Sequence, residues 1–114
     1  MGVPAAGTVV LIPFPFSDLS RSKLRPAVVL AAADRDDLIL CQITSNPYAD
    51  SSALELLESD FRVGSLRRTS YVRPGKLFTA NAGLIVEEVG LLQEAVRDRV
   101  VDAVVAILRG AVHA

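Results

Sequence analysis

The sequence predicts an α+β fold that is mainly β, a small barrel or curled sheet closed by a C-terminal amphipathic helix. Apolar segments of strand length follow one another through most of the chain, separated by short loops rich in proline, glycine and charged residues. Only the last segment has the apolar spacing of an amphipathic helix. The 114 residues suffice for one compact domain, 1–114, and not for two. Short strands joined by brief loops and followed by one helix are typical of a small barrel.

The first fifth of the chain predicts one strand and one long polar loop. Residues 1–6 have no apolar periodicity and are expected to form a loose lead-in. Thr8–Ile12 predicts a short buried strand stopped by Pro13 and Pro15, because proline has no N–H to give to a central ladder. The following loop, Ser17–Arg25, holds three serines and three cations. Arg25 stands directly before a proline, which disfavours the α region and keeps the arginine backbone extended.

The middle of the chain predicts a hairpin followed by several shorter strands. Ala27–Ala33 and Leu38–Thr44 are apolar on both faces, as in the middle of a small closed sheet, and a charged turn at 34–37 joins them. After a loop at 45–52, Ala53–Glu58 fits a short half-exposed strand better than a helix. Residues 60–68 are expected to be irregular. The sequence after them predicts three strands, Thr69–Arg73, Lys76–Thr79 and Leu84–Val89, with turns between them at Pro74–Gly75 and at 80–83.

The clearest element is a helix over about residues 92–109. Its apolar side chains recur at i, i+3 and i+4, at Leu92, Val96, Val100, Ala103, Val104, Ile107 and Leu108. Glu94 in the first turn and Gly110 after the last agree with the helix dipole and with a glycine stop. Val101 and Val105 lie beside the main stripe. This wide apolar arc predicts either a deeply packed helix or a contact with a second chain.

The composition narrows the range of functions. A net charge of −1 argues against strong nonspecific nucleic-acid binding by the whole protein. Cations nevertheless cluster in the first loop. They also cluster between Arg62 and Lys76, a segment that contains no acid. This pattern fits one basic face opposite an acidic one, and it also fits two ordinary solvated surfaces.

Cysteine and histidine usage argue against a metal site. Cys41 is the only cysteine, which excludes an intramolecular disulfide and a cysteine-based zinc site, and we expect it to be a small buried hydrophobe. The only histidine, His113, lies next to the C-terminus. We therefore expect no metal and no cofactor. No secretory signal and no apolar stretch of membrane-spanning length occurs, so we expect a cytoplasmic protein without a membrane partner.

Three motifs carry a family resemblance. Gly7–Asp18 and Lys23–Leu30 give a glycine-led strand, a Pro-Phe-Pro-Phe segment, a polar loop and an Arg-Pro-Ala-Val-Val-Leu strand. In this order they resemble the MazF/PemK-like toxin family, the growth-inhibiting ribonucleases of bacterial toxin–antitoxin pairs. Gln42–Ser45 resembles the second family motif, and Ser70–Val72 followed by Lys76–Thr79 resembles the third. The resemblance covers about residues 7–109 and implies an SH3-like barrel that assembles as a symmetric homodimer.

The resemblance implies an endoribonuclease that cleaves single-stranded RNA without a metal, by attack of the ribose 2′-OH. The catalytic residues it implies are Arg25 and Thr44. A guanidinium can bind two phosphate oxygens at once, and the threonine hydroxyl can donate to the same phosphate. Read without the resemblance, Arg25 fits a surface ion-pair partner and Thr44 an ordinary strand residue. The cognate antitoxin is expected to insert an acidic, flexible segment into the basic groove.

The predicted substrate-binding residues surround these two positions. They are Ser17, Asp18 and Lys23 in the first loop, Gln42, Ser45 and Asn46 beside Thr44, Tyr71 as a base-stacking side chain, and Arg67, Arg68 and Arg73 as phosphate contacts. Most have an ordinary alternative, since Asp18 fits a loop cap and Asn46 a turn start. The alternative function is a non-catalytic binding module of the same fold, either a degenerate toxin or a gyrase-poison-like protein that acts through protein contacts. A shared open groove for Arg25 and Thr44 would favour the enzyme.

Overall fold

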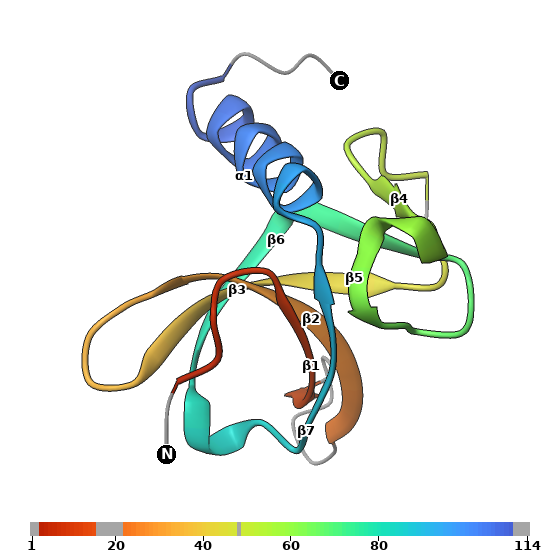
Figure 1. The fold of residues 1–114 in the computed structure, drawn as a ribbon. Coiled ribbons are helices and arrows are strands. Elements are labelled where there is room, and N and C mark those ends of the chain that lie inside the picture. Colours follow the sequence, from red (N-terminus) through yellow and green to blue (C-terminus); the bar gives the residue numbers. More distant parts are fainter. Residues whose placement is uncertain (1–2, 16–21, 48, 111–114) are drawn as a thin grey trace.

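The computed structural model describes residues 3–15, 22–47 and 49–110 and contains one curled antiparallel sheet with a helix at one end (Figure 1). The sheet has seven strands in the order β4-β6-β3-β2-β1-β7-β5. This arrangement confirms the predicted fold class. The elements are β1 (Thr8–Pro15), β2 (Ser22–Ala32), β3 (Asp37–Thr44), β4 (Leu54–Leu56), η1 (Glu58–Asp60), β5 (Phe61–Gly64), β6 (Ser70–Asn81), η2 (Ala82–Leu84), β7 (Glu87–Leu92) and α1 (Glu94–Leu108).

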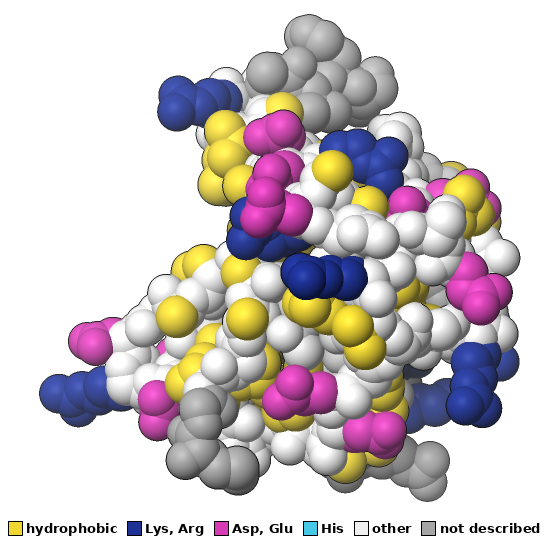
Figure 2. All heavy atoms as spheres, viewed as in Figure 1, with side chains coloured by type: hydrophobic (Ala, Val, Ile, Leu, Met, Phe, Trp, Pro, Cys, Tyr) yellow, Lys and Arg dark blue, Asp and Glu magenta, His cyan; other side chains and the backbone are white. Residues whose placement is uncertain are grey.

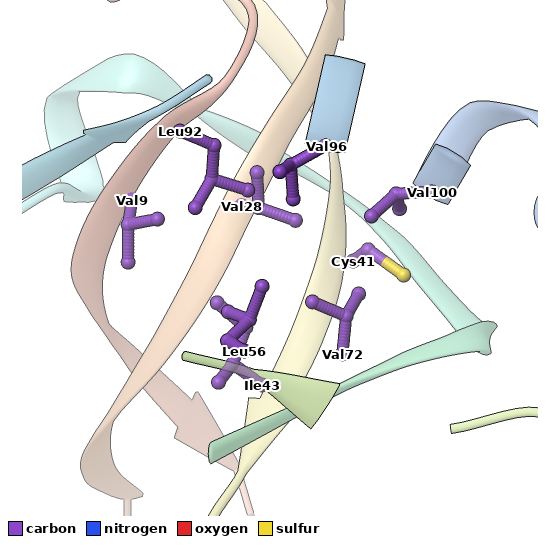
Figure 3. Close-up of a cluster of buried hydrophobic side chains, with 9 residues drawn as sticks. All are labelled: Val9, Val28, Cys41, Ile43, Leu56, Val72, Leu92, Val96 and Val100. Atoms are coloured by element: carbon purple, nitrogen blue, oxygen red, sulfur yellow. The ribbon is translucent and has the colours of Figure 1, made fainter. Parts of the chain in front are cut away.

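Two apolar clusters lie on opposite sides of β1, β2 and β3. The helix-side core lies beneath α1 and contains Val9, Val28, Cys41, Ile43, Leu56, Val72, Leu92, Val96 and Val100 (Figure 3). The hairpin-side core contains Val10, Ile12, Ala27, Val29, Leu38 and Leu40. Because successive strand residues point to opposite faces, neighbours such as Val28 and Val29 enter different clusters. This explains why both hairpin strands are apolar on both faces.

The first strand is longer than predicted, and the predicted stop at Pro13 was wrong. β1 runs to Pro15, and Pro13 pairs with Leu24 of β2. The edge of β1 that faces away from β2 pairs with β7, but only from Thr8 to Leu11. Beyond Leu11 this edge of β1 has no strand beside it. A proline there removes no ladder hydrogen bond. As a consequence β2 begins at Ser22, well before the predicted Ala27.

β6 is one continuous strand where two strands and a turn were predicted. It pairs with β3 on both sides of Pro74–Gly75. The register jumps from Cys41↔Leu77 to Ile43↔Val72, so β6 carries extra residues opposite Gln42. The dipeptide that normally marks a turn thus forms a bulge, which bends the strand without ending it.

The later elements differ in their bounds. Phe61–Gly64 forms β5 inside the segment predicted to be irregular. β7 starts at Glu87 rather than Leu84, because Leu84 is the last residue of η2 and residues 85–86 form the link between them. The helix is confirmed at Glu94–Leu108, with Gly110 at φ +70° just beyond its C-cap. Within the ranges described above, no helix is long and apolar enough to cross a membrane.

Candidate functional site

The two predicted catalytic residues lie at the same end of neighbouring strands. Arg25 is in β2, where it pairs with Ile12 of β1, and Thr44 is the last residue of β3. β2 and β3 pair through Ala27↔Gln42. Continued by two residues, this register places Arg25 opposite Thr44. Arg25 lies two residues from Ala27, and Thr44 lies two residues from Gln42, the partner of Ala27. Because residues two apart in a strand point to the same face, both belong to the sheet face of the hairpin-side core.

The hydroxyl of Thr44 closes a tight turn in this structure. The residue is only 6% exposed. Its Oγ1 donates a hydrogen bond to the carbonyl oxygen of Asn46 at 3.0 Å and accepts one from the Asn46 N–H at 3.1 Å. Ser45 and Asn46 are exposed at this end of the sheet, and Tyr71 of β6 pairs with Thr44. To donate to a phosphate, the Thr44 hydroxyl must exchange the Asn46 carbonyl for the new acceptor.

Gln42 supplies a buried acceptor on the same face. It lies two residues before Thr44, opposite the β6 bulge. Its Oε1 is buried and has no hydrogen-bond partner among the residues that the structure describes. Leaving a buried acceptor unpaired costs about 1–3 kcal/mol, and such groups are rare enough that each needs an explanation. Lys23 is exposed two residues before Arg25, whose own side chain is half-buried.

Arg73 is held by an aspartate in the loop that follows Thr44. Its Nε donates to Oδ2 of Asp50 at 2.9 Å, and the two side chains are 20% and 18% exposed. The other carboxylate oxygen of Asp50 accepts the N–H of Ser52 at 2.9 Å. The pair therefore ties the loop after β3 to the bulge of β6. Sequence reasoning missed Asp50, because no local pattern links it to an arginine 23 residues further along.

The hydrogen bond from Arg73 lowers the pKa of the Asp50 carboxyl from its usual value. A carboxyl whose pKa is lower in the folded state than in the unfolded state stabilises the fold at pH values above its unfolded-state pKa of about 3.9. That stability is lost as the pH falls through the folded-state pKa.

We expect Asp50→Asn to lower the free energy of unfolding by about 1 kcal/mol at pH 7. The variant should also show a flatter decline of this free energy below about pH 4. Urea titrations from pH 2 to 7 measure both effects. Asp34→Asn, in the exposed β2–β3 turn, is the control, and equal pH profiles for wild type and Asp50→Asn would contradict the prediction.

Arg67 and Arg68 lie at a different part of the surface. They line a hollow of about 570 Å³ together with Leu56, Leu57, Glu58, Phe61, Ser65, Leu66 and Thr69. None of the other predicted site residues lines this hollow. Its floor residue Leu56 belongs to the helix-side core, whereas Arg25 and Thr44 belong to the opposite face. The structure thus brings together Arg25, Gln42, Thr44 and Tyr71 and leaves these two arginines apart.

Two further predicted substrate-binding residues, Ser17 and Asp18, lie outside the described residues. Burial raises the pKa of the Cys41 thiol to about 12, and its Sγ donates to the carbonyl oxygen of Arg73 at 2.9 Å. Cys41 is thus a buried structural residue, as predicted. Of the residues with described positions, no three His, Cys, Asp or Glu side chains gather in a way that could hold a metal ion.

Comparisons with known proteins agree with this architecture. Residues 5–108 match the family described as PemK-like, MazF-like toxin of type II toxin–antitoxin system. A search of curated proteins gives no match. Among solved structures, MazE–MazF from Deinococcus radiodurans has a TM-score of 0.75 at 19% identity, covering 95% of this chain and 97% of that one. An endoribonuclease from Mycobacterial species gives 0.70 at 17% identity, covering 95% and 93%. Another, in complex with its cognate antitoxin, gives 0.67 at 15% identity, covering 96% of each chain.

Proposed function

Because the chain belongs to the family of PemK-like, MazF-like toxins of type II toxin–antitoxin systems, we propose that it is a toxin that cleaves single-stranded RNA. The match over residues 5–108 carries this conclusion and confirms the family predicted from the motifs. The likeness to structures described as endoribonucleases supports the activity. The register that brings Arg25 opposite Thr44 supports our proposal that these two residues form its site. No observation favours the non-catalytic module over the enzyme.

In the proposed reaction the ribose 2′-hydroxyl gives up its proton and its oxygen attacks the adjacent phosphorus. The bond from phosphorus to the 5′-oxygen breaks, and the departing 5′-oxygen takes up a proton. The products are a 2′,3′-cyclic phosphate and a 5′-hydroxyl, so no water is consumed. Charge accumulates on the non-bridging phosphate oxygens during the attack. The guanidinium of Arg25 stabilises that charge with two parallel hydrogen bonds. The hydroxyl of Thr44 turns from the Asn46 carbonyl to the same phosphate.

The RNA contacts that we propose surround this pair. Lys23 supplies a phosphate contact at the end of β2, and Tyr71 supplies a ring on which a base can stack. Gln42, Ser45 and Asn46 supply hydrogen-bonding groups for the edges of unstacked bases. Arg73, the further predicted phosphate contact, also holds the loop after Thr44 through Asp50.

Gln42 offers a test that separates binding from stability. In Gln42→Leu the unpaired buried oxygen disappears, so we expect the free energy of unfolding to rise by about 1 kcal/mol. If the amide reads a base, cleavage falls in the same variant through a higher KM. Urea unfolding and steady-state cleavage of a short RNA measure the two effects. A variant that is both less stable and unchanged in KM would show that Gln42 has a structural role only.

We also propose that the chain acts in the cytoplasm as a homodimer that binds an antitoxin protein. The structure in which MazE accompanies MazF supports the protein partner. The exposed side of α1 supports the dimer, because Leu108 is 72% exposed and Val105 39% exposed at its C-terminal end. Figure 2 shows hydrophobic and acidic side chains next to each other along this helix. Sedimentation of wild type and Leu108→Asp tests the dimer, and a monomeric wild type would contradict it.

Cleavage of a long single-stranded RNA in EDTA tests the proposed activity. We expect discrete fragments from the single strand and none from the same sequence annealed to its complement, because double-stranded RNA does not present its base edges. The folded state of the protein is checked by circular dichroism. A well-folded protein that leaves every single-stranded RNA intact would contradict the proposal and favour the non-catalytic module.

A further inference from the structure

The loop between β3 and β4 begins directly after the proposed catalytic residue Thr44. β3 and β4 pair with opposite edges of β6, so residues 45–53 carry the chain from one edge of β6 to the other (Figure 1). We refer to residues 45–53 as the crossover loop. The hydroxyl of Thr44 is hydrogen-bonded to the backbone of Asn46, which lies within this loop. The conformation of the crossover loop therefore decides where the Thr44 hydroxyl points.

Asp50 organises the middle of the crossover loop through its backbone and its carboxylate. Its N–H donates to the carbonyl oxygen of Pro47 at 2.8 Å, and its own carbonyl oxygen accepts the N–H of Ala53 at 3.1 Å. One carboxylate oxygen accepts the N–H of Ser52, and the other accepts Nε–H of Arg73, both at 2.9 Å. Asp50 therefore bonds to both halves of the loop and joins them to β6.

The residue before Asp50 has a backbone conformation that needs support. Ala49 has a left-handed φ of 60°, which residues with a Cβ adopt rarely. Such a conformation persists where the surrounding structure holds it in place. The next residue along the chain is anchored to β6 by the Asp50–Arg73 ion pair, and the partial burial of this pair reduces its screening by salt. Without the pair, we expect the loop between Thr44 and Asp50 to relax.

We propose that Asp50 is a positioning residue for RNA cleavage, because its bond to Arg73 fixes the crossover loop and the loop in turn aims the Thr44 hydroxyl. The inference rests on the proposed function, since it gives Asp50 a part in cleavage at the Arg25–Thr44 site. Asp50 acts through Thr44 and does not itself touch the RNA. A loop held in one conformation keeps the hydroxyl aligned with the phosphate, whereas a relaxed loop misplaces it and slows the chemical step.

The first test compares Asp50→Asn with a matched ion-pair control. Asparagine has one side-chain acceptor oxygen where the carboxylate uses two, so it cannot accept from Ser52 and Arg73 together. We expect kcat for cleavage of a short single-stranded RNA to fall about tenfold while KM stays within about twofold of the wild-type value. Asp98→Asn removes a carboxylate that pairs with Arg97 at 3.0 Å on α1, and it should leave both constants unchanged. A folded Asp50→Asn protein with wild-type kcat would limit Asp50 to a role in stability and overturn the inference.

A double-mutant cycle tests whether Asp50 acts through Arg73. Arg73→Ala removes the same link, and it should also raise KM, because Arg73 is a proposed phosphate contact. If the two side chains act as one unit, the double variant Asp50→Asn/Arg73→Ala should lose no more kcat than either single variant. Losses that multiply to about a hundredfold would show that the two residues act independently, which contradicts the inference.

Amide hydrogen exchange, followed by NMR on the full-length chain, tests the positioning without any cleavage. The N–H of Asn46 donates to Oγ1 of Thr44 at 3.1 Å, so its exchange rate reports on the turn that holds the hydroxyl. We expect Asp50→Asn to raise this rate about tenfold and Asp98→Asn to leave it unchanged. An unchanged Asn46 rate in Asp50→Asn would overturn the inference. A faster rate in a folded protein that cuts no RNA would instead refute the proposed function and support the hold of Asp50 on the Thr44 turn.

Discussion

Arg25→Ala is expected to slow RNA cleavage by about 10²–10³-fold, the usual effect of removing one charge-stabilising donor from an active site. The reason is that Arg25 is the cation of the proposed site, opposite Thr44 when the register of β2 and β3 is continued by two residues. The loss should appear in kcat and in kcat/KM alike, because charge on the phosphate oxygens grows only in the transition state. Single-turnover cleavage of a short RNA measures it directly.

The lysine variant separates charge from geometry at the same position. Arg25→Lys keeps the positive charge but loses the planar pair of donors, so its rate should lie between those of wild type and the alanine variant. Arg62→Ala, an exposed arginine on β5, is the matched control and should cleave as wild type does. A folded Arg25→Ala protein that cuts RNA within a few-fold of wild type would mean that Arg25 is an ordinary surface cation.

Gly64→Ala is expected to destabilise the fold by about 3 kcal/mol or more. Gly64 ends β5 at φ +74° and pairs with Gly90 of β7. A Cβ added there would lie 2.2 Å from the carbonyl oxygen of Val89 and 2.7 Å from Cα of Gly90. Both contacts are backbone, so no flexible side chain can move aside, and β5 must separate from β7. Urea unfolding measures the loss.

Gly110 provides the control for that substitution. It has nearly the same backbone, at φ +70°, but a Cβ added there meets nothing within 4 Å. Gly110→Ala therefore isolates the cost of the left-handed conformation, about 1 kcal/mol. Equal losses in the two variants would show that β5 and β7 separate easily and that their close contact contributes nothing to stability.

Most of the fold was predictable because its signals are local. The hairpin of β2 and β3 follows from two apolar runs around a charged turn, and α1 follows from a regular apolar stripe ending at Gly110. The misplaced elements depend on tertiary context. Pro13 fits within β1 only because β7 leaves that side of the strand, and Pro74–Gly75 forms a bulge only because β3 pairs with β6 on both sides of it.

The candidate site was predictable in part for the same reason. Arg25 and Thr44 stand out through motifs that resemble those of the family, and the strand register places them at the same end of the sheet. The ion pair of Asp50 with Arg73 joins positions far apart in sequence. The unpaired oxygen of Gln42 lies opposite the bulge of β6, and the hollow lined by Arg67 and Arg68 lies where β4 and β5 meet. No sequence window contains the information for these three features.

The most direct test of the central claim uses an RNA that carries a single 2′-deoxyribose at its mapped cleavage position. The account predicts that the wild-type protein, in EDTA, cuts the all-ribose RNA to a 2′,3′-cyclic phosphate and a 5′-hydroxyl. It also predicts that the single deoxy substitution abolishes the cut, because the nucleophile is gone. Mass spectrometry of the fragments identifies the ends. Cleavage of the substituted RNA at the same bond, or ends with a 5′-phosphate, would contradict attack by the 2′-OH.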